Sequence, residues 1–524
     1  MRPSLSCVVL LSLCQSVISA PAPSAVPSPA PTTPAHIEDR DLISDVLGDV
    51  GDVTSDLNKV LSDLGAGSLV GTAGWSAISS ALVPITATKT QTNAASAIST
   101  LSAIHAAKPS ANLYEFIASI VAEGLTTDSV ADALQFVDGI LTGENNMNNV
   151  NTRNPATPVY PQKACGDAPY SLDEGALRAA IYIPSTFTYG KVPPVILVPG
   201  TGNTGYITFQ GNFIQLLTGT SYADPVWLNI PGYLLGDAQI NAEYVAYAMN
   251  YITGISDRNA SVIAWSQGNI DTQWAFKYWP STRKVISNHI AISPDYAGTV
   301  LADLVCPDGL PCDPSVLQQQ YLGSSNFITT LRNNNGDSAY VPTTTLYSAL
   351  FDEIVEPQAG TGASAYLNDA RRVGVTNNEV QTVCAGLAGG SFYTHEGMLY
   401  NPLAFALAKD ALTNGGPGQV SRIDTTAVCN QYLATGLNIG DFLLTENAVL
   451  VAGLALITYL PKATEEPAIS GYALSSVSTC KSSASSTKTS STLSTKTSST
   501  RTTITSSTKT SSKSTSKMST STKR

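Results

Sequence analysis

The stretch "SVIAWSQGNIDTQW", residues 261–274, decides the fold class of this chain. It passes from an apolar run through a Ser and a Gly to residues that favour a helix, and so predicts a strand, a tight turn and a helix. A nucleophile elbow needs small residues two positions before and after its Ser, because strand and helix approach closely there. Ala264 and Gly268 meet this need around Ser266. The alternative is an ordinary serine at a strand-to-helix turn.

The region around this stretch alternates apolar runs with helix-like segments. Six short runs rich in Ile, Val, Leu and aromatic residues predict strands at 177–184, 193–200, 226–231, 261–266, 289–293 and 343–351. Helical patterns lie between several of them, as in 237–253 and 271–279. This alternation predicts an α/β fold with a mostly parallel central sheet flanked by helices. Ligands of such sheets bind at the carboxyl ends of the strands, where Ser266 is expected.

A serine hydroxyl needs a base to take its proton and a carboxylate to orient that base. The chain has four histidines. His36 and His105 precede the predicted sheet and His289 falls in a predicted strand, which leaves His395 in a Gly-bounded loop. In α/β hydrolases the triad follows the order Ser, acid, His, and His395 fits that order.

The acid is expected at the carboxyl end of a strand between the serine and the histidine. Asp352 follows an apolar run there and is the candidate. Glu353 is expected to point elsewhere, as a salt-bridge or solvent residue. Asp295 follows an earlier strand, and a pocket carboxyl and a helix cap or turn residue are both open for it.

Acyl transfer also needs hydrogen-bond donors for the oxyanion of the substrate. The backbone N–H of Gln267 follows the nucleophile, and the loop "VILVPGTGNTG", residues 195–205, can supply a second donor at Thr201. The loop lacks dinucleotide spacing and a Walker lysine, which argues against a phosphate site.

The ends of the 524-residue chain differ from its centre. Composition predicts a secretory signal peptide at 1–20, a Pro-rich linker at 21–36, a helical region at 37–143, a linker at 144–162, a catalytic domain at 163–475 and a disordered, O-glycosylated tail at 476–524. The tail carries nine Lys or Arg from residue 481 onward without an acid or an interleaved aromatic residue. Cell-wall association through the tail stays open, and nucleic acid is not expected as a partner.

Two apolar regions leave alternatives open. The helical region repeats apolar residues at steps of three and four, at Leu42, Val46, Val50, Val53, Leu57, Val60 and Leu64. Its helices either pack together as a small domain or pro-segment, or cover the mouth of an active site. Residues 446–462 are strongly apolar but shorter than a membrane span, and predict a buried core helix or one lining the pocket. No transmembrane segment is expected in the mature protein.

Six cysteines remain after the signal peptide, an even number that suggests disulfides in an oxidising compartment. Cys306 and Cys312 can close a small loop. No pair has CxxC spacing, so neither a metal site nor a redox dithiol is expected, and no cofactor is implied. Asn259 begins the sequon "NAS", a candidate glycosylation site.

Five motifs together resemble the Candida antarctica lipase B-like family of fungal lipases: "PPVILVPGTGNTG", "AWSQGNIDTQW", "ISPDYAGTVLA", "VPTTTLYSALFDEIVEPQ" and "THEG". The resemblance covers roughly residues 160–470 and implies an α/β-hydrolase fold acting on carboxylic esters. It implies a triad of Ser266, Asp352 and His395 and an oxyanion hole of Thr201 and Gln267. It further implies that Trp265 shapes the alcohol side of the pocket, that Asp295 and Gln319 are polar groups in it, that Cys384 pairs with Cys429, and that Cys165 is bridged, with Cys480 as a replacement partner.

The expected function is that of a secreted, monomeric serine hydrolase acting on lipid esters, at a lipid–water interface, by two-step acyl transfer. Two other functions stay open. One is a secreted or cell-wall binding protein that keeps the scaffold without the chemistry. The other is a peptidase or polyesterase with the same triad.

Overall fold

The computed structural model describes residues 57, 59–60, 72–107, 113–139, 141, 143–306, 311–349 and 351–474. The predicted signal peptide, Pro-rich linker and Ser/Thr-rich tail lie outside the described residues, as do Cys480 and most of the apolar repeat between Leu42 and Leu64.

Seven strands form one sheet in the order β1-β3-β2-β4-β5-β6-β7. They are β1 (Ile181–Tyr182), β2 (Pro194–Val198), β3 (Asp224–Leu228), β4 (Ala260–Trp265), β5 (Ile286–Ile292), β6 (Thr343–Tyr347) and β7 (Val375–Glu379). Every pairing is parallel except that of the edge strand β1 with β3. The predicted mostly parallel sheet is therefore confirmed, and each of the six predicted runs overlaps one of its strands.

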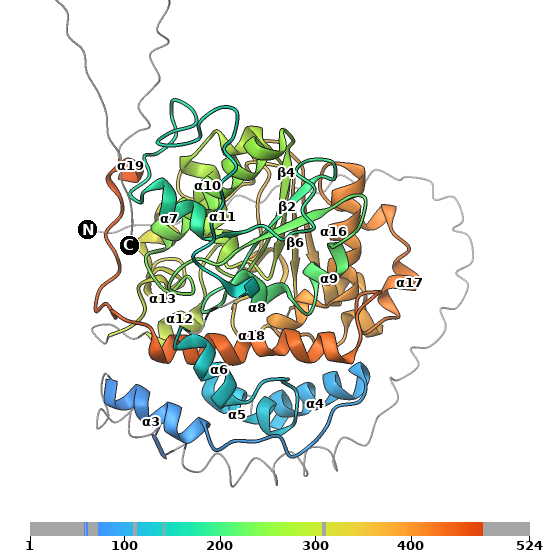
Figure 1. Ribbon diagram of the computed structural model, residues 1–524. Helices are drawn as coiled ribbons and strands as arrows, with labels where there is room; N and C mark the ends of the chain where they lie inside the picture. Colours follow the sequence, from blue (N-terminus) through green and yellow to red (C-terminus); the bar gives the residue numbers. More distant parts are fainter. Residues whose placement is uncertain are drawn as a thin grey trace, which may run out of the picture. The chain divides into compact units, whose positions relative to one another are not determined.

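Both faces of the sheet are buried, which explains why its strands are nearly continuous apolar runs. In β2, Val195 and Leu197 point into one hydrophobic core and Ile196 and Val198 into another, because successive side chains of a strand face opposite ways. Helices cover each face (Figure 1). The sheet is packed between two hydrophobic cores, and this packing holds the ends of its strands in place.

The helices around the sheet vary widely in length. They are α3 (Thr72–Leu82), α4 (Ala94–Ala107), α5 (Leu113–Ala122), α6 (Val130–Val137), α7 (Glu174–Ala179), α8 (Gly205–Phe209), α9 (Phe213–Leu217), α10 (Ala238–Ser256), α11 (Gly268–Tyr278), α12 (Val300–Val305), α13 (Pro314–Gln318), α14 (Asn326–Arg332), α15 (Val380–Val383), α16 (Pro402–Asn414), α17 (Thr425–Cys429), α18 (Ile439–Thr458) and α19 (Gly471–Leu474).

Helix α18 joins the N-terminal helices to the rest of the protein. It contacts α3, α5 and α6 on one side and α8 on another, and lies between the sheet-bearing part and α3–α6 in Figure 1. Its first turn is fixed by a capping box in which Asn438 and Asp441 bond each other's backbone N–H. The helix is long and apolar enough to cross a membrane, but 67% of its most apolar window is buried inside the protein.

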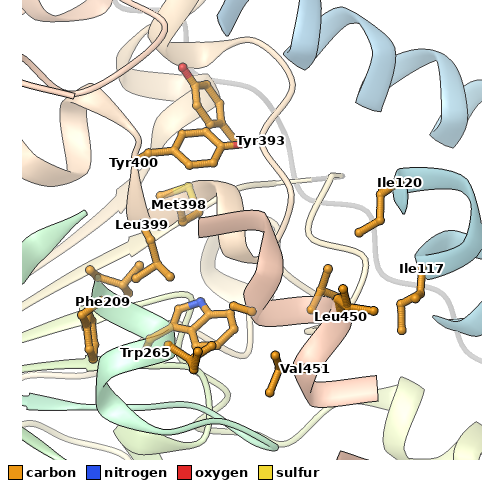
Figure 2. Close-up of a cluster of buried hydrophobic side chains, with 14 of the residues drawn as sticks. Ile117, Ile120, Phe209, Trp265, Tyr393, Met398, Leu399, Tyr400, Leu450 and Val451 are labelled. Carbon is orange, nitrogen blue, oxygen red and sulfur yellow. The ribbon is translucent and has the colours of Figure 1, made fainter. Parts of the chain in front are cut away.

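Packing between α5 and α18 is close. Ile117 and Ile120 of α5 point toward Leu450 of α18 in Figure 2. A Cβ atom at Gly453 would lie 2.2 Å from Cδ1 of Ile117, so the absence of a side chain there lets the two helices approach. The N-terminal helices share one hydrophobic core with α18 and with one face of the sheet.

Residues 144–162, predicted as a linker, lie in part along the sheet-bearing region. The backbone carbonyl of Glu144 accepts hydrogen bonds from the Trp227 indole, at 2.9 Å, and from the Asn229 amide, at 2.7 Å. This segment is thus anchored by polar contacts where it leaves the helical region.

Two disulfides join the pairs Cys306–Cys312 and Cys384–Cys429, with Cα atoms 5.6 and 5.2 Å apart. Cys165 is also disulfide-bonded. Its predicted partner, Cys480, lies outside the described residues.

Candidate active site

Ser266 occupies a strained turn between β4 and α11. Its φ of 53° is a left-handed conformation that residues with a side chain rarely adopt. A Cβ atom at Gly268 would lie 2.4 Å from the carbonyl oxygen of Pro199, and one at Gly200 would lie 2.8 Å from Cβ of Ser266. Gly268, one of the two small residues that the sequence predicted for an elbow, is therefore required by the close approach of the end of β2 to this turn.

Asn269 fixes the turn from behind. Its amide donates to the carbonyl oxygens of Ser266 and Ile292, at 3.0 and 3.1 Å. Its Oδ1 lies 3.1 Å from Nε2 of His289, the histidine on β5. Burial lowers the pKa of His289 to about 3, so this histidine is neutral and belongs to the core.

His395 and Asp352 are in contact. Nδ1 of His395 lies 2.9 and 3.0 Å from the two carboxylate oxygens of Asp352. Asp352 lies on the loop after β6, which ends at Tyr347, and its Oδ1 accepts the backbone N–H of Val355 at 2.8 Å. Nε2 of His395 is buried and has no hydrogen-bond partner among the described residues. Nδ1 is thus hydrogen-bonded to a carboxylate, and Nε2 has no hydrogen-bond partner within the described residues.

The backbone of His395 is held as firmly as its ring. The indole N–H of Trp265 donates to its carbonyl oxygen at 3.1 Å, and the Trp265 and His395 rings are 4.9 Å apart. The N–H of His395 donates to the carboxylate of Glu353 at 3.0 Å. The prediction that Glu353 points away to a salt bridge or solvent is wrong. Asp352 and Glu353 lie on a loop, where the alternation of side chains along a strand does not apply.

Opposing effects act on the imidazole of His395. Burial lowers its pKa, whereas Asp352, through its charge and hydrogen bond, and then Glu396 and Asp295 raise it, and the net shift is upward. Burial raises the pKa of Asp295 to about 7. Both carboxylate oxygens of Asp295 are buried without a hydrogen-bond partner among the described residues. The site therefore concentrates acids around a single histidine.

Thr201, Gln267 and Gln319 come together beside the turn. The hydroxyl of Thr201 lies 2.8 Å from Oε1 of Gln267 and 2.9 Å from Oε1 of Gln319. The amide of Gln319 also donates to Oε1 of Gln267 at 2.9 Å. The hydroxyl has one proton, so it donates to one acceptor at a time and can be redirected to another.

A pocket opens at this end of the sheet. It is lined by Ser266, His395, Thr201, Trp265, Gln319 and Glu396, and by side chains that are mostly apolar, namely Leu113, Thr299, Leu301, Ala302, Val305, Val316, Ile354, Val449, Ala452 and Leu456. Asp295 is not among the described residues that line it. Leu113 belongs to α5, and Val449, Ala452 and Leu456 belong to α18. The segment 446–462 thus forms both a buried core helix and a pocket wall, and a helix of the N-terminal region reaches the pocket.

The acids Glu396 and Glu446 were not among the predicted site residues. Both are fully buried, Glu396 directly after His395 and Glu446 within α18. The sequence held a signal for Glu446, because an acid inside a strongly apolar helix needs a partner. Across the described ranges, no group of three or more His, Cys, Asp or Glu is arranged to hold a metal ion.

Comparisons with known proteins decide the family. No family model matches the chain. Lipase B of Pseudozyma antarctica is 33% identical over 323 residues, which cover 61% of this chain and 90% of that protein. The chain belongs to the lipase B family. The crystal structure of Aspergillus fumigatus lipase B is 46% identical with a TM-score of 0.71, and covers 82% of this chain and 99% of the other.

Family membership confirms the resemblance that the five motifs indicated, and with it the α/β-hydrolase fold. It supports a hydrolase acting on ester bonds. The match to the Aspergillus protein covers a larger share of the chain than residues 163–475 alone, so the likeness extends beyond the predicted catalytic domain.

Proposed function

We propose that this protein hydrolyses carboxylic esters of lipids by a serine-dependent acyl transfer in two steps. Ser266 is the nucleophile, His395 the general base and Asp352 the acid that orients the base. The observation that carries the proposal is the shared pocket: Ser266 and His395 line it together, and Asp352 holds Nδ1 of His395 at 2.9 Å.

In the first step His395 takes the proton of the Ser266 hydroxyl at Nε2 while the serine oxygen attacks the ester carbonyl. Because Asp352 accepts a hydrogen bond from Nδ1, the proton of the neutral ring stays on Nδ1 and the lone pair of Nε2 faces the pocket. The imidazolium then gives its proton to the departing alcohol, which leaves an acyl group on Ser266. Water repeats the sequence and releases the acid.

The oxyanion that forms in each step requires donors. The backbone N–H of Gln267 and the N–H and hydroxyl of Thr201 are proposed for this role. The N-terminus of α11 follows Ser266 directly and adds a positive dipole end at the same place. The Thr201 hydroxyl, which faces two amide oxygens, turns to the oxyanion when substrate arrives.

The mostly apolar pocket supports lipid esters as the substrate class. Trp265 and Gln319 lie in its wall, and Asp295 is a buried acid beside the site that could contribute to it only after a rearrangement. Leu113 supports the reading in which residues 37–143 cap the pocket. The protein is proposed to act as a monomer at a lipid–water interface.

The test compares the full chain with Ser266→Ala on triacylglycerol emulsions and on soluble p-nitrophenyl esters from acetate to palmitate. Hydrolysis by the full chain and none by the variant is expected. A variant that hydrolyses esters as fast as the unaltered chain excludes the proposal. Peptide amides and an aromatic polyester serve as further substrates, and preference for either favours the peptidase or polyesterase alternative.

Secretion is proposed from residues 1–20, and the disulfides support an oxidising compartment. N-terminal sequencing of the protein from the culture medium is expected to begin after Ala20. The same preparation tests the other predicted boundaries, since cleavage near residues 144–162 would release the N-terminal region. Retention of residue 1 in extracellular protein would contradict the signal peptide.

A further inference from the structure

The turn between α10 and β4 carries a motif for N-linked glycosylation. Asn259, Ala260 and Ser261 form the only Asn-x-Ser/Thr sequence in the 524-residue chain. Such a motif accepts an oligosaccharide on the surface of secreted proteins. A three-residue motif also arises by chance, so its position in the fold decides whether the asparagine is available.

The backbone brings Asn259 to the surface. Helix α10 is capped by Asp257, whose φ of 49° is left-handed and turns the chain away from the helix. Strand β4 then begins at Ala260, whose N–H donates to the carbonyl oxygen of Val285 at 3.0 Å. Asp257, Arg258 and Asn259, which join the two elements, are exposed. Asn259 is therefore accessible to a modification that projects into solvent.

Asn259 and the active site lie at opposite ends of one strand. β4 runs from Ala260 to Trp265, and Ser266 follows its last residue. Asn259 precedes its first residue, and none of the described residues that line the pocket of Ser266 and His395 belongs to this turn. A bulky group on Asn259 consequently leaves the pocket open.

A cleft opens beside Asn259, which forms part of its lining. The volume of the cleft, about 360 Å³, lies within the range of small-ligand sites, roughly 300–1,000 Å³. Thr157, Lys163 and Arg258 contribute polar groups to the lining, and Val285 contributes an apolar one. A sugar ring has hydroxyl groups at its edge and an apolar face of C–H groups, so this mixed lining suits it.

Both walls of the cleft are fixed by contacts. On one side the guanidinium of Arg258 donates to the carbonyl oxygens of Gly190 and Lys191, each at 3.1 Å. On the other side a Cβ atom at Gly254 would lie 2.7 Å from Cβ of Pro155, so Pro155 packs directly on α10. The cleft therefore exists in the folded chain without a rearrangement.

We propose that Asn259 carries an N-linked oligosaccharide whose first sugar lies in this cleft, against residues 156–163. The proposal rests on the proposed secretion, because the oligosaccharide is transferred on the secretory route. The co-reactant is an oligosaccharide joined to a lipid through a diphosphate. The amide nitrogen of Asn259 loses a proton and forms a bond to C1 of the first sugar, while the C1–O bond breaks and the lipid diphosphate leaves with its electron pair.

The sugar covers part of the segment predicted as a linker. Residues 156–162 belong to the predicted linker 144–162, and residues 156–158 are exposed. Lys163 follows this segment, lines the cleft and is partly exposed. The reactivity of its amino group therefore reports whether the cleft is filled.

The first experiment isolates the protein from the medium of a fungal host and maps its peptides by mass spectrometry. Trypsin cleaves after Arg258 and Lys277 and so releases Asn259 within residues 259–277. This peptide is expected to carry sugar in the unaltered chain and in Ser261→Thr, which keeps the motif. It is expected to be unmodified in Ser261→Ala and Asn259→Gln. All four proteins are expected to hydrolyse a short-chain ester at equal rates.

The second experiment measures the rate at which acetic anhydride acetylates Lys163. Lys409 is the internal control, an exposed lysine outside the lining of the cleft. Labelling continues until Lys163 of Ser261→Ala has reacted. Acetylation of Lys163 is expected to be several-fold slower in the glycosylated chain than in Ser261→Ala, whereas Lys409 reacts equally in both. Endoglycosidase H, which leaves the first sugar on Asn259, is expected to preserve this protection.

An unmodified Asn259 in secreted protein that begins after Ala20 overturns the modification and leaves secretion and ester hydrolysis standing. Protein that keeps residue 1 and stays in the cells overturns secretion together with this proposal. A glycan on Asn259 with equal acetylation of Lys163 in the two chains overturns the placement of the sugar in the cleft. Thermal unfolding shows whether each variant is folded, and Asn259→Gln takes the place of Ser261→Ala if that variant is not.

Discussion

The surroundings of His289 and His395 form a natural comparison, because both imidazoles are buried, His289 on β5 and His395 on a loop beyond the strand ends. The pKa of His289 is lowered to about 3 and that of His395 is raised. His289 meets the amide oxygen of Asn269 and the hydroxyl of Tyr296, neither of which is charged. His395 meets carboxyl groups instead.

The difference shows that burial by itself makes a histidine neutral and inert, whereas burial among acids makes it a base that can hold a proton. The same fold supplies both environments. On a strand that is buried on both faces, His289 meets only uncharged polar groups. The loops beyond the strand ends bring carboxyl groups to His395. The predictions below test this contrast, from the largest expected effect to the smallest.

His395→Ala is expected to lower kcat for ester hydrolysis roughly 10⁶-fold, as loss of a triad base does in other serine hydrolases. His289→Gln is the paired variant and should stay within about tenfold of the unaltered chain, since Gln can still donate to Asn269. Steady-state kinetics on a soluble ester, with thermal unfolding as the folding check, measures both. Equal losses in the two variants would remove the distinction between the histidines.

Asp352→Asn is expected to lower kcat about 10⁴-fold with little change in KM. An asparagine amide donates to Nδ1 and so moves the ring proton to Nε2, where it blocks the attack of Ser266. Kinetics between pH 6 and 9 tests this, and Asp410→Asn, a buried acid that pairs with Arg422 instead, is the control. A loss below about tenfold would show that Asp352 does not orient the base.

His289 is expected to lower the free energy of unfolding at acid pH. Its pKa is about 3 in the folded protein and about 6.5 in the unfolded chain. The unfolded chain therefore binds a proton first, and the contribution of His289 to stability is complete above pH 6.5 and is lost as the pH falls toward 3. Urea unfolding at pH 7 and 4 should show a loss about 3 kcal/mol larger in the unaltered chain than in His289→Gln. Equal losses would show that His289 is already charged in the fold.

Leu113→Trp tests whether α5 belongs to the pocket. A larger side chain in the wall is expected to raise KM several-fold for a palmitate ester and to leave the acetate ester unchanged. Val83→Trp is the matched control, because Val83 is exposed and lies outside the pocket lining. Unchanged kinetics with both esters in Leu113→Trp would place α5 outside the substrate path.

Much of the fold followed from the sequence because its strands are buried on both faces and read as apolar runs. β7, Val375–Glu379, was not predicted, since this edge strand is polar and only partly buried. Helices α3 and α4 lie inside the region 37–143 that was predicted to be helical, but no apolar repeat was identified at either of them. Both helices are rich in Ser, Thr and Ala, so their buried faces are hard to recognise from the sequence and become clear only from the residues they pack against.

The candidate site was predictable where a short sequence motif determines the local backbone conformation, as at Ser266 and Gly268. It was less predictable where loops bring residues together. Glu353 was expected to point away because strand alternation was assumed beyond Tyr347, the last residue of β6. Glu396 and Glu446 are buried on two separate elements, and no spacing in the sequence connects them.

The most direct test of the account is covalent labelling with a fluorophosphonate, which reacts with an activated serine, followed by mass spectrometry of the peptides. A single adduct on Ser266 is expected, formed far more slowly in His395→Ala and at the normal rate in His289→Gln. An adduct on another serine, or none on Ser266 in protein that hydrolyses esters, would contradict the assignment of Ser266 and His395 as the reacting pair.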